Sequence, residues 1–322
     1  LVYPVALLGD WGTTRLRLYS CDIDRHGIPE VKASVEGPGV KDVSDFQAAF
    51  FHAVRQLPEC RFESNVILAG MVGSNIGWQE TGYVACPASW DDVLCRVISF
   101  SAGEYRVTLL PGASCINEAG YHDVMRGEET QLIGLSQIHL AGRAQRLVCL
   151  PGTHTKWAVI DEQGLQRFAT TVQGELFDVL RRHSILVRGS VEGNDRSRPV
   201  DRAAFAAAVD LLLENDDLGL IQALFSTRSR QLSGEISPQE ATSHLSGLLI
   251  GADVRDVCRP MLRDAGIEQP VLLVGDELIA SLYADAMARN GIDSCRYSGT
   301  ECIVRGLAAC HRGLQQERVI AT

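Results

Sequence analysis

The sequence predicts an α/β protein made of two related lobes. Apolar segments with strand spacing alternate along the chain with segments of helical spacing, which is the element order of α/β folds. A strand that runs into a Gly-Thr turn occurs twice, at Gly12-Thr13 and at Gly152-Thr153, nearly half of the 322 residues apart. A chain of this length can bury a large core, in one big domain or in two medium ones.

The first third of the chain is predicted to begin with strands of a meander, separated by glycine turns. These strands cover residues 5–10, 14–23 and 29–36. Apolar residues at helical spacing predict a helix over 43–57, with Ser44 as its N-cap. Residues 65–73 are typical of a buried strand that ends in a glycine turn.

The second half of the chain repeats this order of elements. Residues 146–161 predict a strand, a Gly-Thr turn and a second strand, and residues 270–288 predict a strand, a glycine turn and a helix. The segments between them predict helices over residues 174–186, 203–213 and 241–262.

Composition and charge exclude several classes of protein. Hydrophobic residues make up 46% of the chain and charged residues 22%, which is ordinary for a folded domain, so disorder is not expected. The net charge is −10 and the basic residues are scattered, so the positive stripe that nucleic acids or anionic membranes require is missing. No apolar run reaches membrane-spanning length. We therefore expect a cytoplasmic protein with neither a nucleic-acid nor a membrane partner.

The ten cysteines show no C-x-x-C pair and no short metal-ligand spacing. They lie at positions 21, 60, 86, 95, 115, 149, 258, 295, 302 and 310. Most have apolar neighbours, so we expect reduced thiols in the core or near the surface, as in cytoplasmic proteins.

Asp10 is an acidic residue at the tip of the first predicted strand. The turn that follows it, at Gly12, Thr13 and Thr14, offers successive backbone N–H groups and hydroxyls that can hold an anion. The Asp10 carboxylate would repel a phosphate, but it can bind one through Mg²⁺, which proteins hold with one or two carboxylates plus substrate phosphates. The alternative is a hairpin whose side chains only cap its own turn.

The second Gly-Thr turn favours the phosphate interpretation. Gly152, Thr153 and His154 again place small residues and a hydroxyl at a turn between strands, and Lys156 adds a positive charge. Two such hairpins could grip a polyphosphate from both sides. Taken singly, His154 is better explained as a turn histidine and Lys156 as a solvated strand residue.

A third element lies late in the chain, where a buried strand ends at Gly275 and leads into a helix. Glycine lets the backbone approach a flat base or a ribose closely, which suits a nucleotide platform. The alternative is a plain connection between a strand and a helix.

In this order, the three elements resemble those of the sugar kinase, actin and heat-shock ATPase superfamily. Five longer blocks resemble those of the 2-dehydro-3-deoxygalactonokinase family. These blocks are AGMVGSNIGWQE, DVMRGEETQLIGL, CLPGTHTKWAVI, TTVQGELFDVLRRHSIL and HLSGLLIGADV. With the opening motif they run from residue 10 to about residue 307, nearly the whole chain. The resemblance implies two ribonuclease-H-like lobes, the actin-like ATPase fold, with an interlobe nucleotide cleft.

The family resemblance also implies a reaction and its cofactors. It implies that ATP phosphorylates the 6-hydroxyl of 2-dehydro-3-deoxy-D-galactonate in galactonate catabolism, with Mg²⁺ held by Asp10. The two phosphate-binding roles of the superfamily fall on Asp10, Gly12, Thr13 and Thr14, and on Gly152, Thr153 and His154. By the same analogy, residues 1–120 with a returning C-terminal helix over 304–318 form the N-terminal lobe, and residues 121–303 form the C-terminal lobe.

A carboxylate is still needed to orient the acceptor hydroxyl and take its proton. In related carbohydrate kinases it stands at the start of the helix before the second phosphate hairpin, where this chain has Glu128 and Glu129. We prefer Glu128 and keep Glu129 as the alternative. Acids at a helix start are also common because the helix dipole favours them there.

The acceptor is itself an anion, so its carboxylate needs an arginine, a hydroxyl or a backbone N–H group. Arg126 stands beside the predicted base, and Ser74, Asn75 and Trp78 lie on a glycine-rich turn suited to a small polar ligand. The alternatives are a structural ion pair for Arg126 and a packing role for Trp78. Gly174 and Glu175 open a predicted helix in a family block, without an assigned chemical task.

One feature departs from the superfamily pattern. Gly275 is followed by Asp276 and Glu277, where the adenosine segment usually has a small residue. Two acids lower nucleotide affinity unless they face solvent or bond the ribose hydroxyls.

Several alternatives stay open at the level of sequence. A kinase of the same fold could act on another small sugar or acid, including the gluco epimer, and a sensor of sugar acids or nucleotides could keep the fold without catalysis. The oligomeric state is open as well, with a homodimer as one option.

Overall fold

The computed structural model describes residues 5–58, 62–117, 120–139, 144–187 and 199–320. By their internal contacts they form two compact units. Unit 1 comprises Leu1–Ala144, Val159–Phe168 and Tyr297–Thr322, and unit 2 comprises Gln145–Ala158 and Ala169–Arg296.

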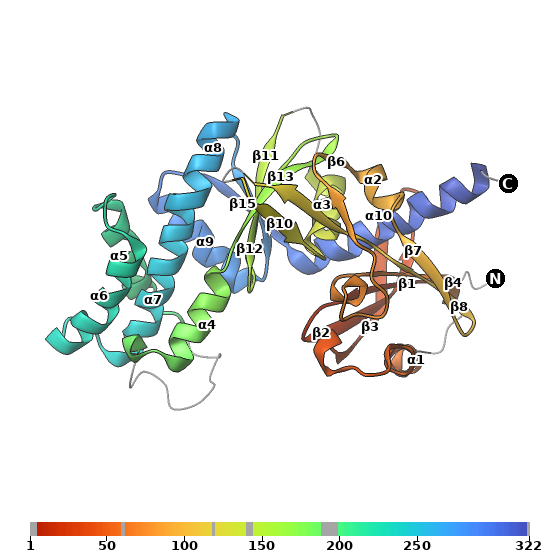
Figure 1. Ribbon diagram of the computed structural model, residues 1–322, viewed down its shortest axis with the longest axis horizontal. Coiled ribbons are helices and arrows are strands. Elements are labelled where there is room, and N and C mark those ends of the chain that lie inside the picture. The colour runs from red at the N-terminus through yellow and green to blue at the C-terminus, as the bar shows by residue number, and fades with distance from the viewer. Residues whose placement is uncertain (1–4, 59–61, 118–119, 140–143, 188–198, 321–322) are drawn as a thin grey trace. The chain divides into compact units, whose positions relative to one another are not determined.

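Unit 1 is built on a six-stranded sheet with the order β3-β2-β1-β4-β8-β7 (Figure 1). Its strands are β1 (Val5–Trp11), β2 (Arg15–Ile23), β3 (Pro29–Pro38), β4 (Phe62–Ala69), β7 (Ile98–Ala102) and β8 (Tyr105–Leu109). β1, β2 and β3 form an antiparallel meander, whereas β4 runs parallel to β1 and β8 parallel to β4. The three strands expected of a meander are thus confirmed, and the arrangement is that expected of a ribonuclease-H-like lobe.

Strand β1 lies at the centre of this sheet and is buried on both faces. Leu7 belongs to a core cluster with Phe50 of helix α1 (Phe46–Gln56), whereas Leu8 belongs to a second cluster with Leu307 of helix α10 (Gly299–Ile320). Central strands of this kind are apolar at successive positions, because helices cover both faces of the sheet. Packing of the fold therefore does not account for an acidic residue, Asp10, at the end of this strand.

Helix α1 begins one residue later than its sequence suggests. Asp45, and not Ser44, is the N-cap, and its Oδ1 accepts a hydrogen bond from the backbone N–H of Ala48 at 2.9 Å. The prediction of Ser44 was wrong because both residue types cap helices well, and only the backbone geometry distinguishes them.

The sequence did not predict the small elements between β4 and α3. They are the 3₁₀ turn Met71–Gly73, the short helix α2 (Trp90–Leu94) and a three-stranded sheet of β5 (Tyr83–Ala85), β9 (Gly112–Ile116) and β10 (His122–Met125). In addition β6 (Ala88–Ser89) pairs with β13 (Gly164–Thr171). Strands this short carry too little periodicity to be recognised from sequence.

Helix α3 (Glu128–His139) lies alongside α10, and glycines let the two helices meet at their backbones (Figure 1). A Cβ atom on Gly134 would lie 1.7 Å from the carbonyl oxygen of Cys302, and one on Gly306 would lie 1.9 Å from that of Thr130. This packing places residues 121–144 in unit 1, although element order had suggested a boundary at residue 120.

Replacing Gly134 with Ala is expected to destabilise unit 1. The added methyl group cannot be accommodated without separating α3 from α10, and overpacking of this kind costs about 1–3 kcal/mol of unfolding free energy. Urea unfolding followed by circular dichroism measures the loss. Gly219→Ala is the control, because no atom lies within 4 Å of a Cβ built there. Equal stability of the two variants would contradict the backbone contact.

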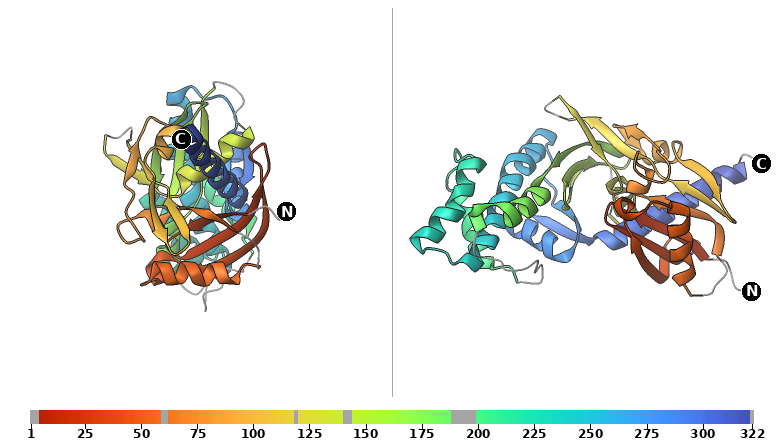
Figure 2. Two further views of the ribbon diagram at one scale, coloured as in Figure 1. Left: turned by 90° about the vertical axis from the view of Figure 1, so that its right-hand side faces the viewer. Right: turned by 60° about the horizontal axis from the view of Figure 1, so that its bottom comes forward.

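Unit 2 combines four strands of the second six-stranded sheet with most of the helices. β11 (Arg146–Leu150), β12 (Thr155–Ile160), β14 (Val271–Gly275) and β15 (Ser294–Ser298) follow the order β15-β14-β11-β12, with β11 and β14 parallel. The helices are α4 (Gln173–His183), α5 (Arg202–Leu213), α6 (Leu220–Ser233), α7 (Pro238–Asp253), α8 (Arg259–Ala265) and α9 (Glu277–Arg289). Both α5 and α6 pack on α7 (Figure 2). Of these, α6 was not predicted.

Nine cysteines lie in the described residues and all nine are free thiols, as expected, while Cys60 lies outside them. Within the described ranges, none of the helices combines the length and the apolar character that crossing a membrane requires.

Candidate functional site

The first Gly-Thr turn is a tight hairpin between β1 and β2. The backbone N–H of Gly12 donates to the carbonyl of Arg15 at 2.9 Å, and Thr13 and Thr14 are exposed at the tip. A neighbouring segment supports the tip, because the N–H groups of Val40 and Lys41 donate to the carbonyls of Gly12 and Thr13. The tip therefore presents hydroxyls and N–H groups on a fixed backbone, as an anion site requires.

Asp10 lies at the end of β1 beside this tip, with a quarter of its side-chain surface exposed. Arg17 faces it on β2 at 3.6 Å. Burial raises the pKa of Asp10 to about 6; the charge of Arg17 opposes the rise and that of Glu128 adds to it. The influence of Glu128 shows that the two carboxylates predicted to handle metal and acceptor lie close enough to repel each other.

Two glycines bring the start of α3 to the end of β1. Gly70 follows β4 with φ of 93°, and a Cβ there would lie 3.2 Å from Asp10 Oδ1. Gly127 precedes α3 with φ of 105°, and its own Cβ would lie 3.4 Å from the Cα of Gly70. Both φ values favour glycine. Any side chain at Gly70 would crowd Asp10.

The two glutamates at the start of α3 have different surroundings. Glu128 is partly exposed, and its Oε2 accepts from the backbone N–H of Arg126 at 3.1 Å. Glu129 is 1% exposed; it accepts from the N–H of Gly127 at 2.7 Å and from the hydroxyl of Thr130 at 3.1 Å. Burial, with a contribution from the charge of Glu128, raises the pKa of Glu129 to about 8. Glu129 therefore acts as a protonated structural group near neutral pH, which leaves Glu128 as the candidate base.

This pKa predicts how stability depends on pH. The folded protein retains the Glu129 proton up to a pH of about 8, whereas the unfolded chain releases it near the ordinary glutamate pKa of 4.5. The unfolding free energy is therefore expected to fall as the pH rises from about 4.5 to about 8. Glu129→Gln, whose amide oxygen can still accept from Gly127 and whose amide N–H can donate to the Thr130 hydroxyl, should flatten this decline in urea titrations at several pH values. The exposed Glu80→Gln is the control, and parallel curves for all three proteins would contradict the assignment.

Arg126 is held by neutral partners on the small sheet of unit 1. Its Nη1 donates to the hydroxyl of Thr81 at 2.7 Å and its Nη2 to the carbonyl of Gly82 at 2.9 Å. The guanidinium lies over the ring of Tyr83, 4.5 Å from the ring centre, and its buried Nε has no hydrogen-bond partner in the described part of the chain. The structural ion pair considered as the alternative is thus not formed with any described residue, and a substrate contact of Arg126 stays a prediction.

The turn after β4 places the remaining substrate candidates. Ser74 is buried and donates to the carbonyl of Met71 at 2.7 Å, whereas Asn75 is exposed. The ring of Trp78 stacks on Phe46 and contacts Trp11 edge-on, at centroid distances of 6.5 and 6.2 Å. Trp78 thus packs against aromatic residues near the Asp10 hairpin. A substrate contact of Trp78 stays a prediction.

The second Gly-Thr turn, in unit 2, rests on the start of α4. A Cβ on Gly174 would lie 2.1 Å from the carbonyl oxygen of Gly152, and the N–H of Glu175 donates to the carbonyl of Thr153 at 2.8 Å. Gly152, Thr153 and His154 are exposed. His154 Nε2 lies 2.6 Å from Glu175 Oε2.

Lys156 lies in β12 and is only 5% exposed. The solvated surface lysine considered as the alternative is therefore excluded. A phosphate contact of its ammonium group stays a prediction.

A buried polar network lies next to this hairpin, at Thr155. The Tyr283 hydroxyl lies 3.0 Å from Thr155 Oγ1, and it donates to Asp253 Oδ2 at 2.5 Å and to Gln173 Oε1 at 3.3 Å. Asp253 also accepts from the indole N–H of Trp157 at 3.1 Å. Burial raises the pKa of Asp253 to about 6, while its hydrogen bonds oppose the rise. The network ties β12, α4, α7 and α9 together.

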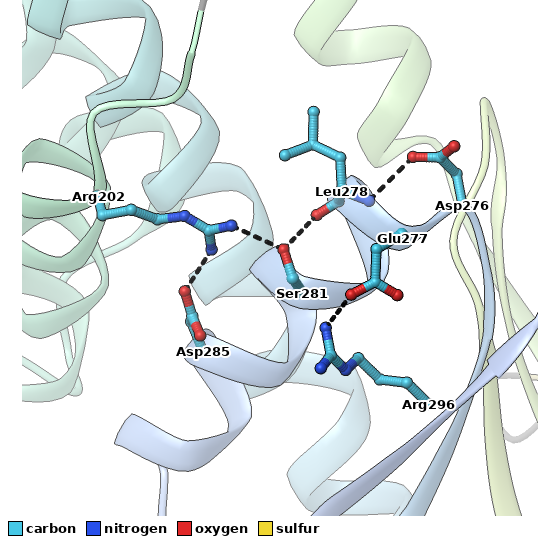
Figure 3. A network of polar contacts seen from close by, with 7 residues as sticks. All are labelled: Arg202, Asp276, Glu277, Leu278, Ser281, Asp285 and Arg296. Carbon is cyan, nitrogen blue, oxygen red and sulfur yellow. Dashed lines mark hydrogen bonds and ion pairs between the residues drawn. The ribbon is translucent and has the colours of Figure 1, made fainter.

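Gly275 ends β14 next to this hairpin, because a Cβ there would lie 3.5 Å from Pro151 Cδ. Asp276 and Glu277, the two acids that follow Gly275, both form contacts within the protein (Figure 3). Asp276 caps α9 by accepting from the N–H of Leu278 at 3.0 Å, and Glu277 pairs with Arg296 at 2.5 Å. Further along the helix, Arg202 bonds Ser281 and Asp285 (Figure 3). Both acids thus have structural roles compatible with a nucleotide platform at Gly275.

No cluster of three or more His, Cys, Asp or Glu side chains that could hold a metal occurs among the residues that the structure describes. A site made of protein ligands alone is therefore not indicated there. Asp10 and Glu128 instead offer one or two carboxylates beside an anion-binding turn, which fits a Mg²⁺ ion that completes its shell with substrate phosphates and water.

Sequence reasoning missed the contacts that connect these residues. It did not assign Gly70, Thr81 or Tyr83, and it gave Glu175, Asp253 and Tyr283 no task. The signals that could have found some of them are the glycines at Gly70 and Gly174 within the family blocks, because a backbone contact is a common reason for glycine beside a site.

Comparisons with known proteins support one family along the whole chain. The family model described as 2-keto-3-deoxy-galactonokinase matches residues 10–310. A Rhizobium meliloti (strain 1021) protein named "Probable 2-dehydro-3-deoxygalactonokinase DgoK1" is 33% identical over 311 residues, which cover 95% of this chain and 96% of that protein. The 2-dehydro-3-deoxygalactonokinase of Escherichia coli (strain K12) is 29% identical over 299 residues, 92% and 94% of the two chains.

Solved structures agree with this similarity. A crystal structure of a Sinorhizobium meliloti protein, provisionally described as a 2-dehydro-3-deoxygalactonokinase, has a TM-score of 0.80 at 31% identity and covers 96% of this chain and 99% of its own. The activator of 2-hydroxyisocaproyl-CoA dehydratase from Clostridium difficile, solved with bound ADPNP, has a TM-score of 0.51 at 11% identity over 98% and 97% of the chains. The second likeness concerns the fold alone.

Proposed function

The chain belongs to the 2-keto-3-deoxy-galactonokinase family, and from this premise we propose that it transfers the terminal phosphoryl group of ATP to the 6-hydroxyl of 2-dehydro-3-deoxy-D-galactonate with the help of Mg²⁺. The family, the sugar-acid kinase activity and the two-lobed α/β architecture of actin-like ATPases, all predicted from the sequence, are confirmed. The position of transfer, the metal and the residue roles are the proposal.

The observation that carries the proposal is the cluster formed by Asp10, Glu128 and the exposed turn at Thr13 and Thr14. Phosphoryl transfer asks a protein mainly for positioning and for neutralising charge. The turn offers N–H groups and hydroxyls to phosphate oxygens, and the Asp10 carboxylate would hold a Mg²⁺ ion beside it. A bound Mg²⁺ would offset the charge that develops on the transferred phosphoryl group.

Glu128 is placed to act on the acceptor. Its carboxylate orients the 6-hydroxyl and receives its proton as the bond from O6 to the γ-phosphorus forms and the bond from that phosphorus to the β–γ bridging oxygen breaks, releasing ADP. Arg126, without an ion-pair partner among the described residues, binds the carboxylate of the sugar acid from the same segment. Ser74, Asn75 and Trp78 border the acceptor on the glycine-rich turn.

Unit 2 contributes the second phosphate element and the nucleoside platform. Gly152, Thr153, His154 and Lys156 contact the phosphates, and Gly275 lies under the adenosine. The parallel neighbours β11 and β14 end at Leu150 and Gly275, and ligands of α/β sheets bind beyond the carboxyl ends of such strands. We place the enzyme in the cytoplasm, which the free thiols support.

A coupled assay of ADP release tests this function. With ATP and Mg²⁺, turnover is expected with 2-dehydro-3-deoxy-D-galactonate, less with the gluco epimer, and very little without an acceptor, because water must be kept from the phosphoryl group. Preference for another acid or sugar would reassign the acceptor. Acceptor-independent hydrolysis at a similar rate would contradict the kinase assignment, and ligand binding without any turnover would indicate a sensor.

A further inference from the structure

The start of α4 is fixed to the second phosphate hairpin by its backbone. Gly174 lies so close to the carbonyl of Gly152 that a side chain would not fit, and the N–H of Glu175 donates to the carbonyl of Thr153. Glycine at this place therefore brings the Glu175 side chain directly over the hairpin. The proposed function has so far given Glu175 no part.

The Glu175 carboxylate reaches one specific atom of the hairpin, Nε2 of His154, at 2.6 Å. An ionised carboxylate only accepts hydrogen bonds, so Nε2 carries the hydrogen in this contact. The ring is thereby held with its other nitrogen, Nδ1, directed away from Glu175. Nδ1 has no hydrogen-bond partner among the described residues, so this nitrogen can contact a ligand.

The base of this arrangement is rigid. Gln173, the residue before Gly174, and Thr155, the residue after His154, both bond the hydroxyl of Tyr283. Tyr283 is fully buried and donates in turn to Asp253. The segments that carry Glu175 and His154 are thus tied to one buried hydroxyl.

Stability alone does not account for the pair. The side chains of His154 and Glu175 are 47% and 55% exposed, and ion pairs with such exposure contribute about 0–1 kcal/mol. A negative group near phosphates would also weaken ATP binding unless another group stood between them. Both points favour a role that Glu175 exerts through His154.

We propose that Glu175 is a positioning residue of the kinase: it accepts the Nε2 hydrogen of His154 and holds the ring so that, in the ATP complex, the ring carries hydrogens on both nitrogens and Nδ1 donates to a phosphate oxygen at the turn Gly152-Thr153. Glu175 itself does not touch ATP. This inference rests on the proposed function in taking ATP as the ligand.

A double-mutant cycle of E175Q and H154Q tests the inference, with D178N as the matched control. Asp178 lies one turn along the same helix and pairs with Arg182 at 3.0 Å, away from the hairpin. E175Q and H154Q are each expected to raise the KM for ATP about tenfold, the loss of one hydrogen bond to a charged group, and to leave the KM for the sugar acid unchanged. The double variant should be no worse than H154Q alone. D178N should match the wild type.

Two further measurements separate positioning from a structural role. ¹⁵N NMR of the imidazole in the ADP complex should show hydrogens on both ring nitrogens in the wild type and a neutral ring in E175Q. Calorimetric ADP binding should weaken by the same factor as the KM rises, and thermal unfolding should show that E175Q is folded.

Additive effects of the two substitutions, or equal behaviour of E175Q and D178N, would overturn the inference. If the wild type bound ADP but phosphorylated no acceptor, the proposed function would fail. The effects of E175Q and H154Q on ADP binding would still test the role of Glu175. If the wild type were an active kinase and the cycle additive, the inference alone would fail.

Discussion

Asp10→Asn is expected to lower kcat by about 10²-fold or more, a loss typical of removing one group that stabilises transition-state charge. The turn at Thr13 and Thr14 would still bind phosphate, but without the carboxylate the divalent cation loses its protein ligand. The KM for ATP should therefore change less than kcat. Steady-state kinetics of ADP release measure both constants.

The same substitution is expected to leave stability unchanged or to increase it. Burial already penalises the ionised Asp10 carboxylate, as its raised pKa shows, and the charge of Glu128 adds to the penalty. A neutral amide avoids both costs. The ionised Asp10 carboxylate thus lowers stability, as functional groups often do. Asp22→Asn is the control, because Asp22 lies exposed on β2 and pairs with Lys32 at 3.3 Å. A fully active Asp10→Asn variant would contradict the role of this carboxylate.

Glu128→Gln is expected to reduce kcat by about 10²- to 10⁴-fold, the usual contribution of a general base. The effect lies toward the lower end if Glu128 mainly orients the hydroxyl, since deprotonation is not far advanced in a loose transition state. Binding of ADP should be unaffected. The pKa of Asp10 should also fall, because the charge of Glu128 helps to raise it.

Glu129→Gln is the matched comparison for Glu128→Gln, one residue along the same helix. Its carboxyl group accepts from Gly127 and Thr130 inside the protein. An amide oxygen can keep the first bond, and the amide N–H can donate to the Thr130 hydroxyl in place of the second. We expect it to retain most activity. If Glu129→Gln lost more activity than Glu128→Gln, the roles of the two glutamates would have to be exchanged.

Much of the fold could be predicted because its central elements have strong local patterns. β1 and β4 contain continuous apolar runs, at residues 5–8 and 66–69, and the Gly-Thr turns stand out between strands. The small sheet around Tyr83 could not be predicted, because its strands have three to five residues and mix exposed with buried positions. Sequence cues also failed at Ser44, where the neighbouring Asp45 caps the helix.

The candidate site was predictable to the extent that its residues are adjacent in sequence. Asp10 and the turn after it form one segment, as do Arg126, Glu128 and Glu129. The proximity of Asp10 to Glu128 depends instead on Gly70 and Gly127, and only the folded backbone brings these together. Likewise Glu175 meets His154 across 21 positions, and Tyr283 meets Asp253 across 30, distances at which residue spacing carries no signal.

The burial of the two glutamates illustrates the same limit. The sequence offers Glu128 and Glu129 as equivalent acids at a helix start, and helical geometry directs neighbouring side chains to different sides. Only the structure shows that Glu129 is buried, which raises its pKa to about 8, whereas Glu128 is partly exposed next to Asp10. The choice between them thus follows from tertiary packing.

The central claim is that the phosphoryl group of ATP is transferred to the 6-hydroxyl of the sugar acid. Proton–phosphorus correlation NMR of the product formed from 2-dehydro-3-deoxy-D-galactonate, ATP and Mg²⁺ tests it most directly. The product is expected to be a phosphomonoester whose phosphorus couples to the methylene protons at carbon 6, formed in equal amount with ADP. Coupling to a proton on another carbon, or release of inorganic phosphate alone, would contradict it.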